Sequence, residues 1–402
     1  MANQKNGALS TVNAIRIFLL ASSAAYLIGA IAAPDRGEMM SGLAQILMSP
    51  AQLTKDYFLV GSVSGTFLNV ALVGFVCAAM TCLPGAAVNG GTVAAYFLTT
   101  GFSFWGINFL NIWPFFLGVM LHALARKEPF PKYVNLAMFA TALCPFASEM
   151  LLRYPGNGEV HGITIGSAAL MLVVGMLIGF LTPAMAAHSP NVHKGYDLYS
   201  AALPGVLLGL FGVAVLYKSL GHDVPEIKAS LGESHPGVVW AFCIVFFGLC
   251  ILAGFWLNGK SFKGYGALLK DTGHKSDFAA KYGPGLAIVN VGVYGLMILA
   301  YYIFVNAIRG DALAGFNAVT IGIVFCMVCF GANGAHPGNV WPIMAGYVLC
   351  SYAATLCLGG VFPVNNQAIM VGLCFASGLA PIAGNYGWWA GILAGGMHYF
   401  LV

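Results

Sequence analysis

The strongest candidate for chemistry is Glu149, a carboxylate near the end of a proline-interrupted apolar run. It lies four residues after Pro145 and four residues before Arg153. An ionisable side chain inside the hydrocarbon layer is costly and marks a functional site by default; here it would couple proton or cation movement to a substrate pocket. The same spacing also suits an ordinary ion pair at a helix end. We predict the coupling role for Glu149 and keep the helix-end pair as the alternative.

A second group of candidates consists of amide side chains and one imidazole that cluster with glycine around predicted helix ends. Amides offer hydrogen-bond donors and acceptors without charge, which suits a small polar solute or a dehydrated cation. The same side chains can instead join helices in lipid, at about 0.6–2 kcal/mol each, and we interpret the mid-helix Asn69 and Asn290 in this way. The predicted substrate contacts are Asn89, Asn108, Asn111, Asn333, His336, Asn339 and Asn385.

Other chemical motifs are weak or absent. The sequence has no His-Glu-x-x-His pattern, no phosphate-binding P-loop and no Gly-x-Ser-x-Gly elbow, so we predict no catalytic residue, no metal and no cofactor. His188, His193 and Asp197 share one loop without an obvious fourth ligand, and we interpret them as solvated. Most of the ten cysteines lie in apolar runs, where structural thiols are expected.

The elements that must position these residues are defined by composition. The 402 residues are 59% hydrophobic and 7% charged, against about 25% charged in a soluble chain. No charged residue follows Asp311, so this part of the chain is not the surface of a soluble domain. We predict an all-α, multi-pass integral membrane protein. A net charge of +4 spread over short loops leaves no basic stripe for nucleic acid.

Apolar runs of about 20 residues predict transmembrane helices. Two of the runs, 88–104 and 131–151, are short or interrupted by Cys144-Pro145, and we predict broken or re-entrant helices there. The thirteen apolar segments are 13–33, 58–82, 88–104, 107–126, 131–151, 160–185, 199–219, 236–258, 283–307, 313–331, 336–358, 365–385 and 387–402.

The chain also repeats itself in order. Matched Trp-Pro pairs and matched asparagines are not readily explained by the apolar bias of membrane segments. We therefore predict repeat one at 1–222 and repeat two at 223–402, and we interpret the matched Asp56 and Asp277 as helix N-terminal charges. The matched positions include Asp56 with Asp277, Asn69 with Asn290, Asn89 with Asn317, Asn111 with Asn339, Trp113-Pro114 with Trp341-Pro342, and Pro145 with Pro381.

Loop charges predict the relative orientation of the repeats, because short cytoplasmic loops are enriched in Lys and Arg. Loop 34–57 carries a net −1, whereas its counterpart 258–282 carries a net +3. Loop 126–132 carries a net +2, whereas its counterpart near 359–365 is uncharged. The positive loops therefore occupy non-equivalent positions in the two repeats, as expected if each repeat crosses the membrane an odd number of times. We predict two inverted-topology repeats of about five to seven transmembrane helices each.

Repeat two looks shorter than repeat one. Repeat one continues beyond its 160–185 segment into the motif His193–Tyr199 and one more apolar segment. Repeat two has no counterpart of either, because it stops at Val402 within a membrane run. We expect the natural gene product to continue further, since membrane proteins seldom end inside the hydrocarbon layer.

These motifs resemble a bacterial family of multi-pass membrane proteins of unknown function, whose domain occurs twice per chain. The resemblance covers nearly the whole chain and brings neither a substrate nor a mechanism. It rests on the paired Asn69-Val70 and Asn290-Val291, the turn 331–339, the break Leu379-Ala380-Pro381, and His193–Tyr199.

The function predicted from the residues is secondary active transport of a small polar solute or ion by alternating access. Equivalent positions in inverted repeats meet at a pseudo-two-fold axis, where transporter sites form from broken helices. A channel for a small neutral or cationic solute is one alternative, and an intramembrane enzyme using Glu149 and His336 as acid and base is another. The expected location is the bacterial inner membrane, with lipid and the solute as partners; a homo-oligomer is compatible with the sequence.

The predicted inversion can be tested by labelling lysines from one side of intact cells. Loops 126–132 and 258–282 should be labelled only after the membrane is permeabilised, because both are predicted to be cytoplasmic. Labelling of these two loops from opposite faces would contradict the inversion.

Overall fold

The computed structural model describes residues 10–50, 56–155, 160–224, 236–309, 317–358 and 367–401. The secondary structure in these ranges is helical, and eight of the described helices are long and apolar enough to cross a membrane. The predicted all-α, multi-pass membrane protein is therefore confirmed. Loop 359–365 and the start of the predicted segment 313–331 lie outside the described residues.

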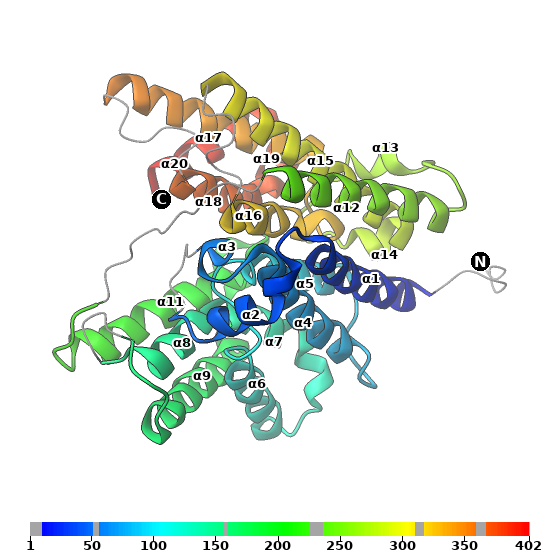
Figure 1. Cartoon of the computed structure of the whole chain (residues 1–402). Coiled ribbons are helices and arrows are strands. Elements are labelled where there is room, and N and C mark those ends of the chain that lie inside the picture. Colours follow the sequence, from blue (N-terminus) through cyan, green and yellow to red (C-terminus); the bar gives the residue numbers. More distant parts are fainter. Residues whose placement is uncertain are drawn as a thin grey trace.

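The first half of the chain, below the second half in Figure 1, runs from α1 to α11. Short 3-10 helices occur at Arg36–Glu38 (η1), Phe130–Tyr133 (η2) and Thr141–Leu143 (η3), and a π-helix (η4) at Ala214–Lys218. The α-helices are α1 (Thr11–Ala32), α2 (Met39–Leu47), α3 (Tyr57–Val60), α4 (Val63–Thr81), α5 (Gly90–Phe102), α6 (Trp113–Ala125), α7 (Val134–Ala140), α8 (Cys144–Leu152), α9 (Ile165–Ala186), α10 (Ser189–His193) and α11 (Ala202–Val213).

The second half runs from α12 to α20, with 3-10 helices at Cys329–Ala332 (η5) and Ser377–Leu379 (η6). Its α-helices are α12 (Pro236–Leu257), α13 (Tyr265–Leu268), α14 (Phe278–Tyr282), α15 (Pro284–Arg309), α16 (Ala318–Val328), α17 (Pro337–Cys357), α18 (Gln367–Ala376), α19 (Ala380–Tyr386) and α20 (Trp388–Leu401).

Four helix pairs make the most extensive contacts, and they match between the halves: α1 with α4, α12 with α15, α6 with α9, and α17 with α20. Glycine allows two of these pairs to approach closely. A Cβ atom on Gly118 of α6 would overlap Met176 O of α9, and one on Gly346 of α17 would overlap Ile392 O of α20. Small residues at such contacts are typical of helix packing in lipid, where close van der Waals contact drives association.

At the centre, α5 lies beside α16 and η5 in an antiparallel pair. Gly90 at the start of α5 contacts Ala332 at the end of η5, and Leu98 O lies 3.8 Å from Cys326 Sγ. Gly101, near the end of α5, contacts Gly322 of α16. Both helices are apolar on all sides and nearly fully buried, as expected for core helices.

Two of the membrane spans are broken at matching positions. The 3-10 helix η3 separates α7 from α8 directly before Cys144-Pro145, and η6 separates α18 from α19 directly before Ala380-Pro381. Proline lacks the N–H that would continue the hydrogen-bond ladder, but it is tolerated in the first turn of a new helix. The predicted break in segment 131–151 is confirmed, and segment 88–104 forms the short helix α5 of 13 residues.

The packing of α17 on α20 gives a stability prediction. Gly346→Ala should destabilise the protein by about 1–3 kcal/mol, since the added methyl group overpacks a contact with backbone. The matched control is Gly248→Ala in α12, where a Cβ atom meets nothing within 4 Å. The measurement is the thermal unfolding midpoint in detergent; equal midpoints for the two variants would contradict the close contact.

Candidate functional site

The first cluster of predicted contacts forms a compact turn between α5 and α6, residues 103–111, here called the first amide turn. Asn69 of α4 donates to Ser103 O at 2.8 Å and to Ile107 O at 3.0 Å. Asn108 and Asn111 each accept a backbone N–H of the other at 2.9 Å. The Asn111 amide also donates to Ser148 Oγ at 3.0 Å, which ties the turn to α8.

The second amide turn, residues 331–339 between α16 and α17, repeats these interactions. Asn290 of α15 donates to Gly331 O at 2.7 Å and to Ala335 O at 2.8 Å. Asn339 accepts from His336 N at 2.9 Å and donates to Gly334 O at 2.9 Å. The interpretation of Asn69 and Asn290 as residues that join helices agrees with these bonds, which satisfy carbonyl groups in irregular backbone.

His336 is held in one neutral form within the second amide turn. Its Nδ1 atom accepts Gly338 N–H at 3.1 Å, so its Nε2–H donates to Asp271 O at 2.8 Å. Burial lowers the pKa of His336, although the Asp271 carbonyl and the charge of Asp271 act in the opposite direction. A neutral imidazole fixed by two backbone groups is a turn-forming residue, because both of its nitrogen atoms are already engaged.

Of the remaining predicted contacts, Asn89 and Asn333 lie near each other beside Gly91 at the start of α5, on the side of the second amide turn, whereas Asn385 lies in α19. Asn89 is the exposed N-cap of α5. Its Oδ1 atom accepts Thr92 N–H at 3.2 Å, and its backbone N–H donates to Thr92 Oγ1 at 3.0 Å. Asn333 is half-buried near the start of α5, with its amide nitrogen 4.0 Å from a Cβ position on Gly91. Asn385 is exposed in the last turn of α19.

The two amide turns lie at opposite ends of the central helix pair and do not form one pocket. The second turn reaches the start of α5 through the contact of Ala332 with Gly90, whereas the first turn follows the end of α5. A helix of 13 residues separates them by about 20 Å. Glu149 follows Ser148 beside the first turn and His336 belongs to the second, so the structure does not form the acid–base pair required by the enzyme alternative.

Glu149 is engaged in a buried ion pair with Arg153. Its Oε2 atom lies 2.7 Å from both Nε and Nη2 of Arg153. The two residues are 8% and 7% exposed. This is the helix-end pair that the spacing also allowed, and it gives Glu149 a structural role at the end of α8. Its coupling role stays a prediction.

Asp56 and Asp277 connect the two halves reciprocally. Each caps its own helix, as predicted: Asp56 accepts Phe58 N–H of α3 and Asp277 accepts Ala280 N–H of α14, both at 3.0 Å. Asp56 also accepts Ala318 N–H at the start of α16, at 3.2 Å, and Asp277 accepts Gly90 N–H at the start of α5, at 3.1 Å. The sequence predicted that Asp56 and Asp277 cap their own helices. Their contacts with the opposite half were not predicted, and the only sequence feature that pointed to them was the match between the two aspartates.

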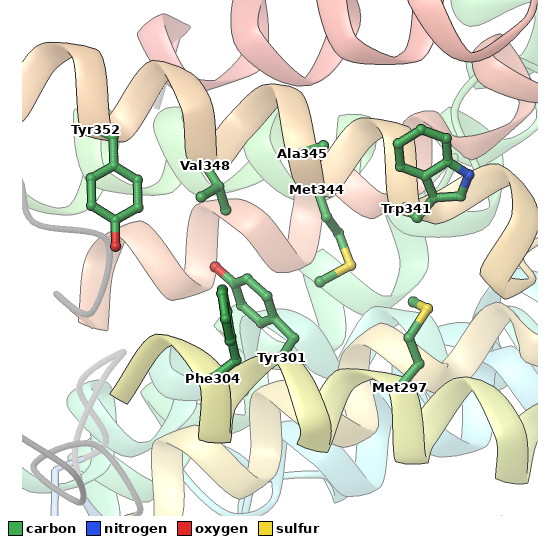
Figure 2. Close-up of a pocket in the computed structure, with 8 residues that line it drawn as sticks. All are labelled: Met297, Tyr301, Phe304, Trp341, Met344, Ala345, Val348 and Tyr352. Carbon is green, nitrogen blue, oxygen red and sulfur yellow. The ribbon is translucent and has the colours of Figure 1, made fainter. Parts of the chain in front are cut away.

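A groove between α15 and α17 has a volume of about 270 Å³, and Figure 2 shows the side chains that line it. Apart from two tyrosine hydroxyls and one indole N–H, its lining is apolar, and no predicted site residue contributes to it. Such a surface matches lipid chains better than a polar solute. The lining residues are Met297, Tyr301, Phe304, Trp341, Met344, Ala345, Val348 and Tyr352.

The prediction that His188, His193 and Asp197 are solvated loop residues is wrong in part, because His193 is half-buried at the end of α10. His188 is exposed, but Asp197 is half-buried and Tyr199 is buried. The described residues contain no group of three His, Cys, Asp or Glu side chains that could hold a metal ion. The signal that sequence reasoning undervalued was the polar motif His193–Tyr199 itself, which lies between two apolar helices.

Removal of the Glu149 carboxylate should expose the role of the ion pair. Glu149→Gln is expected to lower the free energy of unfolding by about 3 kcal/mol, because it replaces the carboxylate that contacts the buried Arg153 guanidinium with a neutral amide. Thermal unfolding in detergent measures the effect. The double variant Glu149→Gln/Arg153→Gln is the control and should regain part of the loss; no difference between single and double variants would contradict the pairing.

Comparison with known families agrees with the resemblance noted from the motifs. A family model described as a protein of unknown function (DUF1576) matches residues 35–218 and 257–402. The two segments cover most of the chain, which therefore belongs to this family. No curated protein and no solved structure matches the chain.

Proposed function

We propose that this member of the DUF1576 family is a secondary active transporter of a small polar solute or ion, built from two inverted copies of one unit in the bacterial inner membrane. The observation that carries the proposal is the reciprocal contact of Asp56 with α16 and of Asp277 with α5. Inverted repeats with interrupted helices are a recurrent architecture of secondary transporters.

The reciprocal contacts support the inversion through the path of the chain. Asp56 stands just before α4 and contacts the start of α16, so α4 and α16 begin at the same face. Helix α4 then crosses to the other face, where α5 begins beside Asp277. Helix α15 follows Asp277 and therefore begins at that second face. Equivalent helices α4 and α15 thus run in opposite directions.

The positive loops support the same orientation. Arg16 at the start of α1 donates to Thr81 O at the end of α4, at 2.9 Å. Pro131 O in the loop before α7 accepts Ala87 N–H at 3.4 Å, beside the start of α5. The lysine-rich loop before α14 reaches the same helix start through Asp277. All three basic regions share one face, which the positive-inside rule assigns to the cytoplasm.

The packed centre favours a carrier over an open channel. The Phe325 ring of α16 lies 5.3 Å from the ring of Tyr26 in α1 and 5.3 Å from that of Phe246 in α12. The glycine contacts between α5 and α16 close the other side of the same region. Passage of a solute then requires one bundle to move against the other, and the breaks at η3 and η6 supply positions where spans can bend.

Counterflow in proteoliposomes tests the proposal. Liposomes are loaded with each of a panel of unlabelled amino acids, sugars, organic acids and monovalent cations, and entry of the same labelled solute is followed. A carrier should give saturable, transient accumulation for at least one solute, since exchange is faster than net flux. Protein-free liposomes are the control. Unsaturable flux without counterflow would contradict a carrier and support the channel.

A further inference from the structure

The segment that follows α10 leaves the first half and inserts into the second. Leu198 N donates to Gly378 O at 2.9 Å, and Tyr199 Oη donates to Cys326 O at 2.8 Å. Gly378 belongs to η6, near the middle of the membrane span Ala368–Tyr386, and Cys326 lies at the crossing of α5 with α16. Residues 197–199 therefore reach the interrupted backbone in the middle of that span, although they belong to no membrane span, and Leu198 also contacts Gly334 of the second amide turn.

Asp197 brings a carboxylate into this position. Its Oδ1 atom accepts Tyr199 N–H at 2.9 Å and would lie 2.8 Å from a Cβ atom on Gly378. Only glycine leaves room for the carboxylate against the interrupted backbone of η6. A carboxylate at this depth is costly and is a candidate for function by default, most of all beside a helix break.

We propose that Asp197 is the proton-binding carboxylate through which this transporter couples solute movement to proton movement. The proposal rests on the proposed function for its coupling role, whereas proton binding by Asp197 stands on the geometry. The protonated carboxyl group suits the apolar surroundings of η6, and the ionised form requires the backbone N–H and nearby imidazoles for stabilisation. Movement of α18 against α19 would change the relative stability of the protonated and ionised forms of Asp197.

Ionisable groups approach Asp197 from three sides. On its own segment, His193 Nδ1 accepts Gly195 N–H at 3.1 Å and Asp197 N–H at 3.4 Å, and its Nε2 lies 2.9 Å from Ser200 Oγ. His398 of α20 acts on Asp197 electrostatically. The carbon chain of Lys275 packs against Gly195, nearer the loop before α14. The element η6 offers only backbone at the contact.

Together these groups favour the protonated form of the Asp197 carboxyl group more than water does. Burial raises the pKa of Asp197, whereas the Tyr199 N–H and the two histidines lower it by smaller amounts. Polar contacts extend from this segment toward the lysine-rich loop before α14. There, His274 Nε2 donates to Lys194 O at 2.9 Å, and the hydroxyl groups of Tyr196 and Tyr386 lie 2.8 Å apart.

Carbodiimide labelling of the wild-type protein tests proton binding directly. Dicyclohexylcarbodiimide adds to protonated carboxyl groups in apolar surroundings and forms a stable N-acylurea, which is located by peptide mass spectrometry. Labelling of Asp197 should fall as the pH is raised, with a midpoint above the ordinary carboxylate value of about 3.9. Asp223, which is exposed, is the internal reference. No labelling of Asp197 at any pH, or a midpoint at or below the ordinary value, would overturn the site.

Stability against pH gives a second measurement. Because the pKa of Asp197 is raised in the folded protein, its protonated form contributes stability at low pH that is lost as the pH rises through that pKa. Asp197→Asn should remove this loss and raise the unfolding midpoint near neutral pH relative to wild type. Asp223→Asn is the matched control and should retain the wild-type profile. An Asp197→Asn profile parallel to wild type would contradict the assignment.

Coupling is tested in the liposomes that show counterflow. An inward proton gradient should accelerate net solute uptake by the wild type and by Asp223→Asn. Asp197→Asn should lose the gradient-driven part, measured relative to its own rate of exchange. Retention of that part in Asp197→Asn would overturn the coupling role. Absence of counterflow in the wild type would instead defeat the transporter proposal, while the labelling result would still decide the proton site.

Discussion

The fold depends on the close antiparallel contact of α5 with α16. The two helices touch along their whole length at glycine and small side chains, and each begins against a carboxylate from the opposite half of the chain. A helix start buried in a membrane protein must satisfy its free N–H groups internally. Asp56 and Asp277 meet this need across the halves, so neither half completes its own central helix without the other.

The amide side chains also satisfy backbone groups, at the opposite terminus of each central helix. In both halves an asparagine from the preceding long helix ties down two carbonyl groups of the amide turn, and a second asparagine closes the turn. Duplicated polar residues therefore mark duplicated backbone geometry.

The Asp197 segment links the first half of the chain to the broken span of the second. It comes from the first half, but its contacts are with η6 of the second half and with α16 at the central crossing. The break at η6 exists because proline follows it, and interrupted backbone at that depth is tolerated only where protein covers it. A loop from one half therefore covers the break in the other.

Several features could be read from the sequence because local chemistry determines them. The low charge content required membrane helices, Cys144-Pro145 required a break, and the spacing of Glu149 and Arg153 allowed the ion pair that forms. Other features depended on tertiary structure. The amide turns lie about 20 Å apart along α5 instead of converging. Asp197 is half-buried, because segments remote in sequence pack around it. Spacing along a chain determines which neighbours a side chain has within its own helix, whereas its burial is decided by the elements that fold against it.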